Sequence, residues 1–214
     1  MPPILVINPN SNEAVTEGLR VALARFASAV PVECLTLAEG PFGIESQRDA
    51  DAVVLPLARL VEDRPDAGAF VIACYSDPGL DTCRSVTRAP VFGIQDAGVL
   101  TAMARADLFG IVALSADSTA RHRRYMRRMG VLDRLAGDRA IEMSVAESAS
   151  GERTFEKLVE VGRALMADGA GALVLGCAGM ARHRAGLEAE LGIPVIDPVQ
   201  AAVAMAMGTV LANG

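Results

Sequence analysis

The chain has 214 residues, of which 51% are hydrophobic and 21% charged, a balance that is typical of a globular protein with a substantial core. A formal net charge of −6 argues against binding to nucleic acid or to an anionic membrane, and an aromatic content of 4% without Trp argues against a stacking platform for bases or sugars. The amino-terminal segment has no signal-peptide pattern, and no apolar run reaches the roughly 18 residues of a membrane-spanning helix. We therefore expect a cytoplasmic protein whose partners are small molecules, such as a small-molecule substrate, or other proteins.

The first elements predict a strand, a loop and a helix. An apolar run from Ile4 to Ile7 stops at Asn8, and capping residues then lead into a helical pattern from about Glu13 to Ala29. Asn8 thereby lies at the carboxyl end of a strand. Two interpretations of it are open: a residue of a binding pocket, or a turn residue that bonds its own backbone.

A second strand is predicted from Val32 to Leu37, followed by a loop with two glycines from Gly40 to Ser46. Phe42 in this loop is a candidate for the wall of a pocket, and the alternative is that it anchors the loop on the core. The next helix is expected from about Arg48 to Glu62, with a kink or a restart at Pro56.

The apolar run from Phe70 to Cys74 is short enough for one buried parallel strand, and the turn formers from Ser76 to Gly79 indicate that a helix starts next. Cys74 is thereby expected at the carboxyl end of a strand and beside a helix amino terminus. Ligands bind at this edge of open α/β sheets, and the helix dipole favours a thiolate there. The first half closes with a strand around Val91 to Ile94.

The second half is predicted to begin with a bridging helix from Gly98 to Ala106 and a strand from Phe109 to Leu114. The polar segment after this strand, which starts at Ser115, corresponds to the loop at Asn8. The remaining pattern predicts a strand at Ala140–Val145, a polar connection at Glu147–Arg153, a helix at Thr154–Ala167, a strand that ends at Cys177, a helix at Ala181–Leu191, a strand at Ile193–Asp197 and a final helix from Pro198.

The segment from Arg121 to Arg128 is a dense basic run. On a helix, Tyr125 faces inward and arginines such as Arg121 face outward, which is typical of a solvated helix face. A role in binding phosphate or a partner is the alternative. His122 and His183 adjoin arginines without a metal-ligand spacing, so we expect both at the surface.

The two halves repeat one another around a cysteine. Pro90 follows Cys74 by 16 residues and Pro194 follows Cys177 by 17, each at the start of a short apolar strand. We therefore predict two similar Rossmann-like α/β lobes with parallel sheets, related by a pseudo-two-fold axis, with the active site in the cleft between them.

The predicted boundaries of the lobes follow from this repeat. The first lobe is expected to span residues 1–97, completed by a carboxyl-terminal helix at 198–214, and the second residues 98–197. Four cysteines without a CxxC spacing predict neither a disulfide framework nor a zinc site, and Cys34 and Cys83 are expected to have no part in function.

Two cysteines that face each other across a cleft suit one chemistry. A proton on a carbon next to a carbonyl can be removed from one face by the thiolate of Cys74 or Cys177 and returned to the other face by the opposing thiol, which inverts the centre. A free thiol with a pKa of about 8.5 needs only a modest shift to ionise at about pH 7, and a helix amino terminus favours that shift. The scheme requires no metal and no organic cofactor. The alternative is that both cysteines are buried apolar residues at strand ends.

The negative charge that develops on the carbonyl oxygen needs hydrogen-bond donors aimed at it. Backbone N–H groups and hydroxyls just after each cysteine strand are the candidates. They belong to Tyr75 and Ser76 on one side and to Ala178 and Gly179 on the other, with Asn8 and Ser115 at the rim.

Short motifs in the chain resemble a known family. They are INPNS from Ile7 to Ser11, CYSDPGL from Cys74 to Leu80, LGCAGM from Leu175 to Met180, and PVID from Pro194 to Asp197. Over nearly the whole chain they look like the aspartate/glutamate/hydantoin racemase superfamily, and most like its hydantoin and allantoin racemase branch. The resemblance implies two α/β lobes, cofactor-independent proton transfer by Cys74 and Cys177, and frequent homo-oligomers.

Departures from the superfamily pattern bear on the substrate. Its amino-acid racemases usually have Asn-Thr and Thr-His after the cysteines, whereas this chain has Tyr75-Ser76 and Ala178-Gly179. We therefore expect a racemase that acts on a cyclic ureide such as a 5-substituted hydantoin or allantoin. The open alternatives are an amino-acid racemase, a maleate-isomerase-like enzyme with a nucleophilic cysteine, and a non-catalytic ligand binder or regulatory protein, for which the basic run is the best argument.

The segment from Ala201 to Leu211 is apolar on nearly every face of a helix. One lobe is not expected to bury all of it, so the helix either inserts between the lobes or seals a subunit interface. Together with the resemblance, this pattern predicts at least a homodimer.

Overall fold

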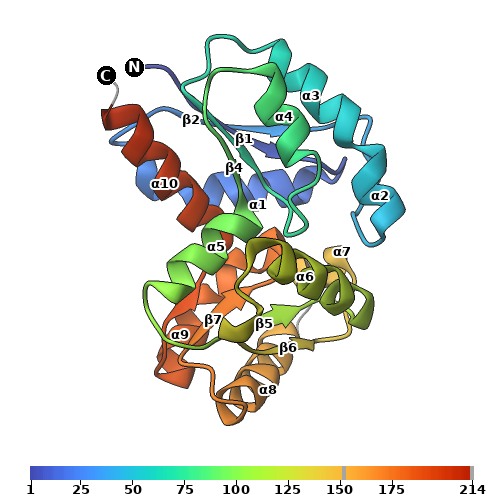
Figure 1. Ribbon diagram of the computed structural model, residues 1–214, viewed down its shortest axis with the longest axis vertical. Coiled ribbons are helices and arrows are strands. Elements are labelled where there is room, and N and C mark those ends of the chain that lie inside the picture. Colours follow the sequence, from blue (N-terminus) through green and yellow to red (C-terminus); the bar gives the residue numbers. More distant parts are fainter. Residues whose placement is uncertain (151–152, 213–214) are drawn as a thin grey trace.

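The computed structural model describes residues 1–150 and 153–212, which form two α/β lobes, one above the other in Figure 1. Each lobe is built on a four-stranded parallel sheet, with the strand order β2-β1-β3-β4 in the first lobe and β6-β5-β7-β8 in the second. The repeated order confirms the predicted fold class of two similar Rossmann-like lobes. No helix in the described part of the chain is long and apolar enough to cross a membrane.

The first sheet follows the apolar runs of the sequence. Its central strands β1 and β3 are buried along their whole length, which is why both read as continuous apolar segments. The strands are β1 (Ile4–Asn8), β2 (Val32–Thr36), β3 (Ala69–Ile72) and β4 (Val91–Gly93).

The second sheet repeats this arrangement around the buried strands β5 and β7. Its strands are β5 (Phe109–Ala113), β6 (Leu135–Ala140), β7 (Ala172–Leu175) and β8 (Val195–Ile196). The predicted strand at Ala140–Val145 is wrong, because the edge of the sheet is formed by β6. β6 is only half-buried, so its sequence LAGDRA carries polar residues and does not stand out from a loop.

The helices of the first lobe differ from the prediction in the position of one break. They are α1 (Glu13–Leu23), which continues as the 3₁₀ helix η1 (Ala24–Phe26), α2 (Gln47–Ala52), α3 (Val54–Glu62) and α4 (Leu80–Val86). The predicted restart at Pro56 is wrong, because the break falls at Val53, between α2 and α3. Pro56 lies in the first turn of α3, where a helix leaves backbone N–H groups without intrahelical partners.

Among the helices after β4, α8 has the bounds that the sequence predicts. They are α5 (Ile94–Met103), α6 (Ala116–Met129), the 3₁₀ helix η2 (Leu132–Arg134), α7 (Val145–Ser150), α8 (Thr154–Ala167), the 3₁₀ helix η3 (Ala178–His183), α9 (Arg184–Leu191) and α10 (Pro198–Ala212). α5 begins directly after β4, earlier than the predicted Gly98, so the lobe boundary at residue 97 falls within a helix and stays a prediction. The polar connection predicted at Glu147–Arg153 is wrong for its first residues, which belong to the helix α7. Residues 151–152 lie outside the described part.

The carboxyl-terminal helix α10 lies beside the first sheet and against α5 (Figure 1). Its contacts with α5, β1, β3 and β4 bury side chains such as Val199, Val203, Ala206 and Val210. The helix is apolar on most faces because the chain itself covers them, so its composition no longer argues for a subunit interface. The predicted homo-oligomer stays a prediction, and residues 213–214 of the predicted helix lie outside the described residues.

Candidate active site

Cys74 and Cys177 occupy equivalent places in the two lobes. β3 ends at Ile72 and β7 at Leu175, and each cysteine follows two residues later. Both cysteines line one cavity of about 40 Å³. The rest of its wall is formed by Asn10, Val15, Ile44, Ala73, Tyr75 and Ser76 of the first lobe and by Leu114, Ser118, Arg121, His122, Val145, Gly176, Ala178 and Gly179 of the second.

Cys74 is followed by a tight turn rather than directly by a helix. Its carbonyl oxygen accepts a hydrogen bond from the N–H of Asp77, and α4 begins only after Gly79, whose φ of 67° favours glycine. Burial raises the pKa of the Cys74 thiol to about 12, although a hydrogen bond from the backbone N–H of Ser76 lowers it. The helix that the sequence predicts beside Cys74 therefore begins only after this turn, at Leu80.

Cys177 directly precedes a helical turn, the short 3₁₀ helix η3. Burial raises the pKa of its thiol, while hydrogen bonds from the backbone N–H of Gly179 and from the hydroxyl of Ser148 lower it. The Ser148 oxygen lies 3.8 Å from the sulfur. Ser148 belongs to α7, and no sequence motif identified it. The same hydroxyl lies 2.8 Å from the backbone oxygen of Val145 and has one proton for both acceptors, so the N–H of Gly179 is the donor committed to the sulfur.

Burial raises the pKa of both thiols in this cavity, which is opposite to the shift towards pH 7 that the sequence led us to expect. The free energy lost when a thiolate leaves water is larger than the stabilisation that the nearby hydrogen-bond donors provide. A charge on Cys177 also raises the pKa of Cys74, after the larger effect of burial. Ionisation of one cysteine therefore opposes ionisation of the other, which favours one thiolate opposite one thiol.

His122 lies inside the protein, and its predicted place at the surface is wrong. The residue is 2% exposed and lines the cavity. Its Nδ1 atom lies 3.0 Å from Oδ2 of Asp138, whose side chain is equally buried. Because α6 packs this side against β6, the strand that carries Asp138, the histidine is covered. No local pattern identifies this pair, since 16 residues separate its members.

Arg121 faces the cavity, and the outward orientation predicted for it is wrong. Its guanidinium group donates to the backbone oxygen of Glu45 at 2.8 Å and to the hydroxyl oxygen of Ser118 at 3.2 Å. Its positive charge also acts against the burial that raises the pKa of Cys74. Arg121 thus joins α6 of the second lobe to a loop of the first, at the wall of the cavity.

Some of the binding residues predicted from the sequence line the cavity: Tyr75, Ser76, Ala178 and Gly179. The Tyr75 ring meets the ring of His122 in a T-shaped arrangement, with centroids 5.0 Å apart. The buried Tyr75 hydroxyl has no hydrogen-bond partner among the described residues. The side chain of Tyr75 therefore supports His122 through its ring rather than through a hydrogen bond.

The other predicted binding residues, Asn8, Ser115 and Phe42, lie outside the wall of this cavity. Asn8 is buried behind the wall, where its amide donates to Oδ1 of Asn10 at 3.0 Å, and Asn10 itself lines the cavity. Ser115 caps α6 through its side-chain oxygen. Phe42 is 65% exposed, and Ile44 of the same loop is the residue that reaches the cavity.

The remaining cysteines and the second histidine lie away from the cavity. Cys83 is buried in the core of the first lobe, and Cys34 is half-buried on the edge strand β2. Burial raises the pKa of each of these thiols to about 11. His183 is half-buried against the ring of Phe155, with centroids 6.0 Å apart, rather than fully at the surface.

The sequence model of the Asp/Glu/hydantoin racemase family matches residues 4–206 of this chain. Two relatives named hydantoin racemase are 36% identical to it: one from Paenarthrobacter aurescens over 95% of this chain and 89% of its own, and one from Pseudomonas sp. (strain NS671) over 95% and 84%. A solved structure, allantoin racemase from Klebsiella pneumoniae, matches 100% of this chain and 89% of its own with a TM-score of 0.92 and 34% identity. The chain therefore belongs to the Asp/Glu/hydantoin racemase family and is an isomerase of the racemase type.

Proposed function

We propose that this chain racemises a cyclic ureide, such as a 5-substituted hydantoin or allantoin, with Cys74 and Cys177 as the acid and the base. The shared cavity carries the proposal, because two thiols from equivalent positions in opposite lobes line one small space. The names of the relatives, hydantoin racemase and allantoin racemase, support a ureide as the substrate. Apolar side chains in the wall, among them Ile44, Leu114 and Val145, suit an uncharged ring.

In this proposal, one cysteine starts as a thiolate and the other as a thiol. The thiolate removes the proton from the ring carbon next to the carbonyl, and the electron pair of the C–H bond passes into that carbonyl. The opposing thiol then delivers its proton to the other face of the same carbon. The two sulfurs have exchanged roles, so the enzyme is ready for the reverse direction. The N–H groups of Ser76 and Gly179 stabilise whichever sulfur is charged.

The cavity must widen to admit such a ring. A volume of about 40 Å³ holds a few water molecules, since one water needs roughly 10–15 Å³, and a cyclic ureide is larger. Arg121 joins the lobes through Glu45 at the edge of this space. We therefore expect the lobes to separate, or Arg121 to move, when the substrate enters.

His122 is placed to stabilise the charge that develops on the carbonyl oxygen. This role requires a proton on both ring nitrogens: Nδ1 then donates to Asp138, and Nε2 is left to donate to the substrate oxygen. His122→Asn should lower kcat by about a hundredfold or more with a smaller change in KM. His183→Asn, outside the cavity, is the matched control. Initial rates of optical-rotation decay measure both, and a wild-type kcat in His122→Asn would remove this residue from the mechanism.

The decay of optical rotation in solutions of single enantiomers tests the proposed function. We expect 5-methylhydantoin and allantoin to lose rotation faster with enzyme than in buffer alone, without added cofactor, and aspartate and glutamate to keep theirs. Loss of rotation with amino acids alone would identify an amino-acid racemase. Conversion of maleate to fumarate would identify an isomerase with a nucleophilic cysteine. Thermal stabilisation by a ureide without turnover in any assay would favour the non-catalytic binder.

A further inference from the structure

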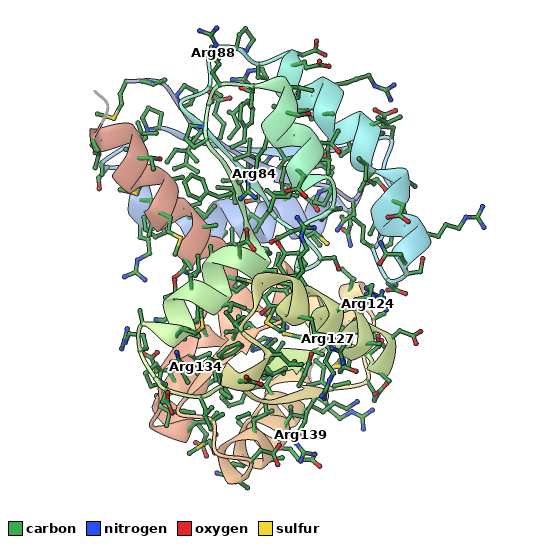
Figure 2. The ribbon with its side chains drawn as sticks, viewed as in Figure 1. Arg84, Arg88, Arg124, Arg127, Arg134 and Arg139 are labelled. Atoms are coloured by element: carbon green, nitrogen blue, oxygen red, sulfur yellow. The ribbon has the colours of Figure 1, made fainter. Side chains whose placement is uncertain are left out.

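A second cavity, of about 300 Å³, adjoins the one that holds the cysteines. Ser76 and Arg121 line both cavities, so these side chains form the boundary between them. We call the larger space the arginine cavity, because Arg121, Arg124 and Arg128 of α6 line it. Figure 2 shows Arg124 on α6, on the side nearer to the first lobe. A substituent that leaves the cysteine cavity past Ser76 and Arg121 enters this space.

Buried donors at the arginine cavity have no partner within the described residues. They are Nε of Arg121 and the side-chain amide nitrogen of Gln95, a residue that is 1% exposed. Unpaired buried polar groups are rare in folded proteins, because each one forfeits its hydrogen bond to water. Both groups are donors, so a ligand that satisfies them must bring acceptors.

Two of the cations at this cavity have only neutral partners. Arg121 donates to the backbone oxygen of Glu45 and the hydroxyl of Ser118, and Arg124 donates to the side-chain oxygen of Gln47 at 3.3 Å. Within residues 1–150 and 153–212, no carboxylate forms an ion pair with either guanidinium group. Arg121 does lower the pKa of Asp49, but this is the smallest effect on that carboxyl group, which is bound to Ser46 instead. Neither guanidinium group is therefore committed to a carboxylate.

The acidic groups nearby are already engaged. Arg128 is paired with Asp81, and Asp51 accepts a hydrogen bond from a glutamine side chain. The buried carboxyl group of Asp77 accepts from two backbone N–H groups, and it shares the single proton of the Tyr125 hydroxyl with Asp96. Burial raises the pKa of Asp77 to about 7, which reduces its charge at neutral pH. An anion that enters this cavity therefore faces hydrogen-bond donors that are still unused, whereas the carboxylates named here already have partners.

We propose that the arginine cavity is the subsite for the substituent on the reacting carbon, and that it selects a substituent ending in a carboxylate. The inference rests on the proposed racemisation of a hydantoin-like ring. Arg121, Arg124 and Gln95 supply the N–H donors to the carboxylate oxygens, and charge-assisted hydrogen bonds of this kind are about twice as strong as neutral ones. The ring itself stays between the cysteines.

A third cavity, of about 420 Å³, offers the opposite chemistry. It lies between α1 and η3, shares Val15, Ala178 and Gly179 with the cysteine cavity, and is lined mainly by small and apolar residues. An alkyl substituent suits that space. A substituent placed there leaves the donors of Arg121 and Gln95 unpaired, which is why the arginine cavity is favoured.

Calorimetric binding of three racemic ligands to the wild-type protein tests the subsite. The ligands are 5-(2-carboxyethyl)hydantoin, its neutral analogue 5-(2-carbamoylethyl)hydantoin, and 5-isobutylhydantoin. Racemic ligands are used because interconversion of their enantiomers produces no net heat. We expect the acid to bind about tenfold more tightly than the amide, and this preference to disappear in Arg124→Gln. The matched control is Arg123→Gln, an exposed neighbour outside the cavity, which should keep the preference.

Equal affinity for the acid and the amide would overturn the inference. Tighter binding of the isobutyl ligand than of the acid would also overturn it and would direct the substituent to the apolar cavity. If Arg123→Gln lost the preference as fully as Arg124→Gln, the preference would depend on the net charge of the protein rather than on contacts in the arginine cavity. That result would also overturn the inference. Racemisation is followed separately with 5-methylhydantoin. No turnover together with an intact preference for the acid would contradict the proposed function and support the subsite.

Discussion

Serine in place of Cys74 or of Cys177 is expected to lower the rate of racemisation by about a thousandfold, while proton exchange on one face of the substrate persists. A serine hydroxyl is far less acidic than a thiol, and the burial that raises the pKa of both thiols disfavours an alkoxide as well. In each variant, the remaining cysteine can remove the proton of one enantiomer and return it to the same face.

Proton exchange in D₂O, followed by NMR, separates the two faces. Each variant should exchange the proton of one enantiomer with retention of configuration, and the two variants should act on opposite enantiomers. Cys34→Ser is the control, because Cys34 lies on the edge strand β2, away from the cavity. Racemisation at near wild-type rates in both variants would return Cys74 and Cys177 to the role of core residues. A nucleophilic isomerase would show one indispensable cysteine and no exchange linked to the other.

Alanine in place of Gly176 is expected to destabilise the protein and to slow racemisation together. A Cβ atom at this position would lie 2.6 Å from the backbone oxygen of Val112 on β5, and a backbone atom in a central strand cannot move aside. Overpacking of this kind costs about 1–3 kcal/mol of unfolding free energy. Because Cys177 is the next residue, we expect its sulfur to be displaced and the rate to fall about a hundredfold.

Thermal unfolding and racemisation rates of the purified variants check this expectation. Gly208→Ala is the control, because nothing lies within 4 Å of a Cβ atom at that exposed position of α10. An alanine in a helix is favoured over glycine by about 1 kcal/mol, so this variant should be slightly more stable and fully active. A Gly176→Ala protein with wild-type stability and rate would show that β7 and β5 leave room for a side chain.

Local patterns in the sequence were enough to predict the two-lobe fold and the place of the two cysteines. Strands such as Ile4–Asn8 and Ala69–Ile72 are buried on both faces, so their sequences are apolar without interruption. The repeat of cysteine and proline in the two halves then placed Cys74 and Cys177 at matching strand ends. The edge strand Leu135–Ala140 escaped this reasoning, because a half-buried strand keeps polar residues.

The other side chains that meet the cysteines, and the direction in which the pKa of each thiol shifts, depend on how distant parts of the chain pack together. His122 and Arg121 look like parts of a solvated basic run until α6 packs against β6 and the loop at Glu45. Their partners lie 16 and 76 residues away, beyond the reach of any helical or strand period. The raised pKa of each thiol comes first from burial by residues of both lobes. Burial is a sum over contacts that are distant in sequence, and it exists only once the lobes have closed around the cavity.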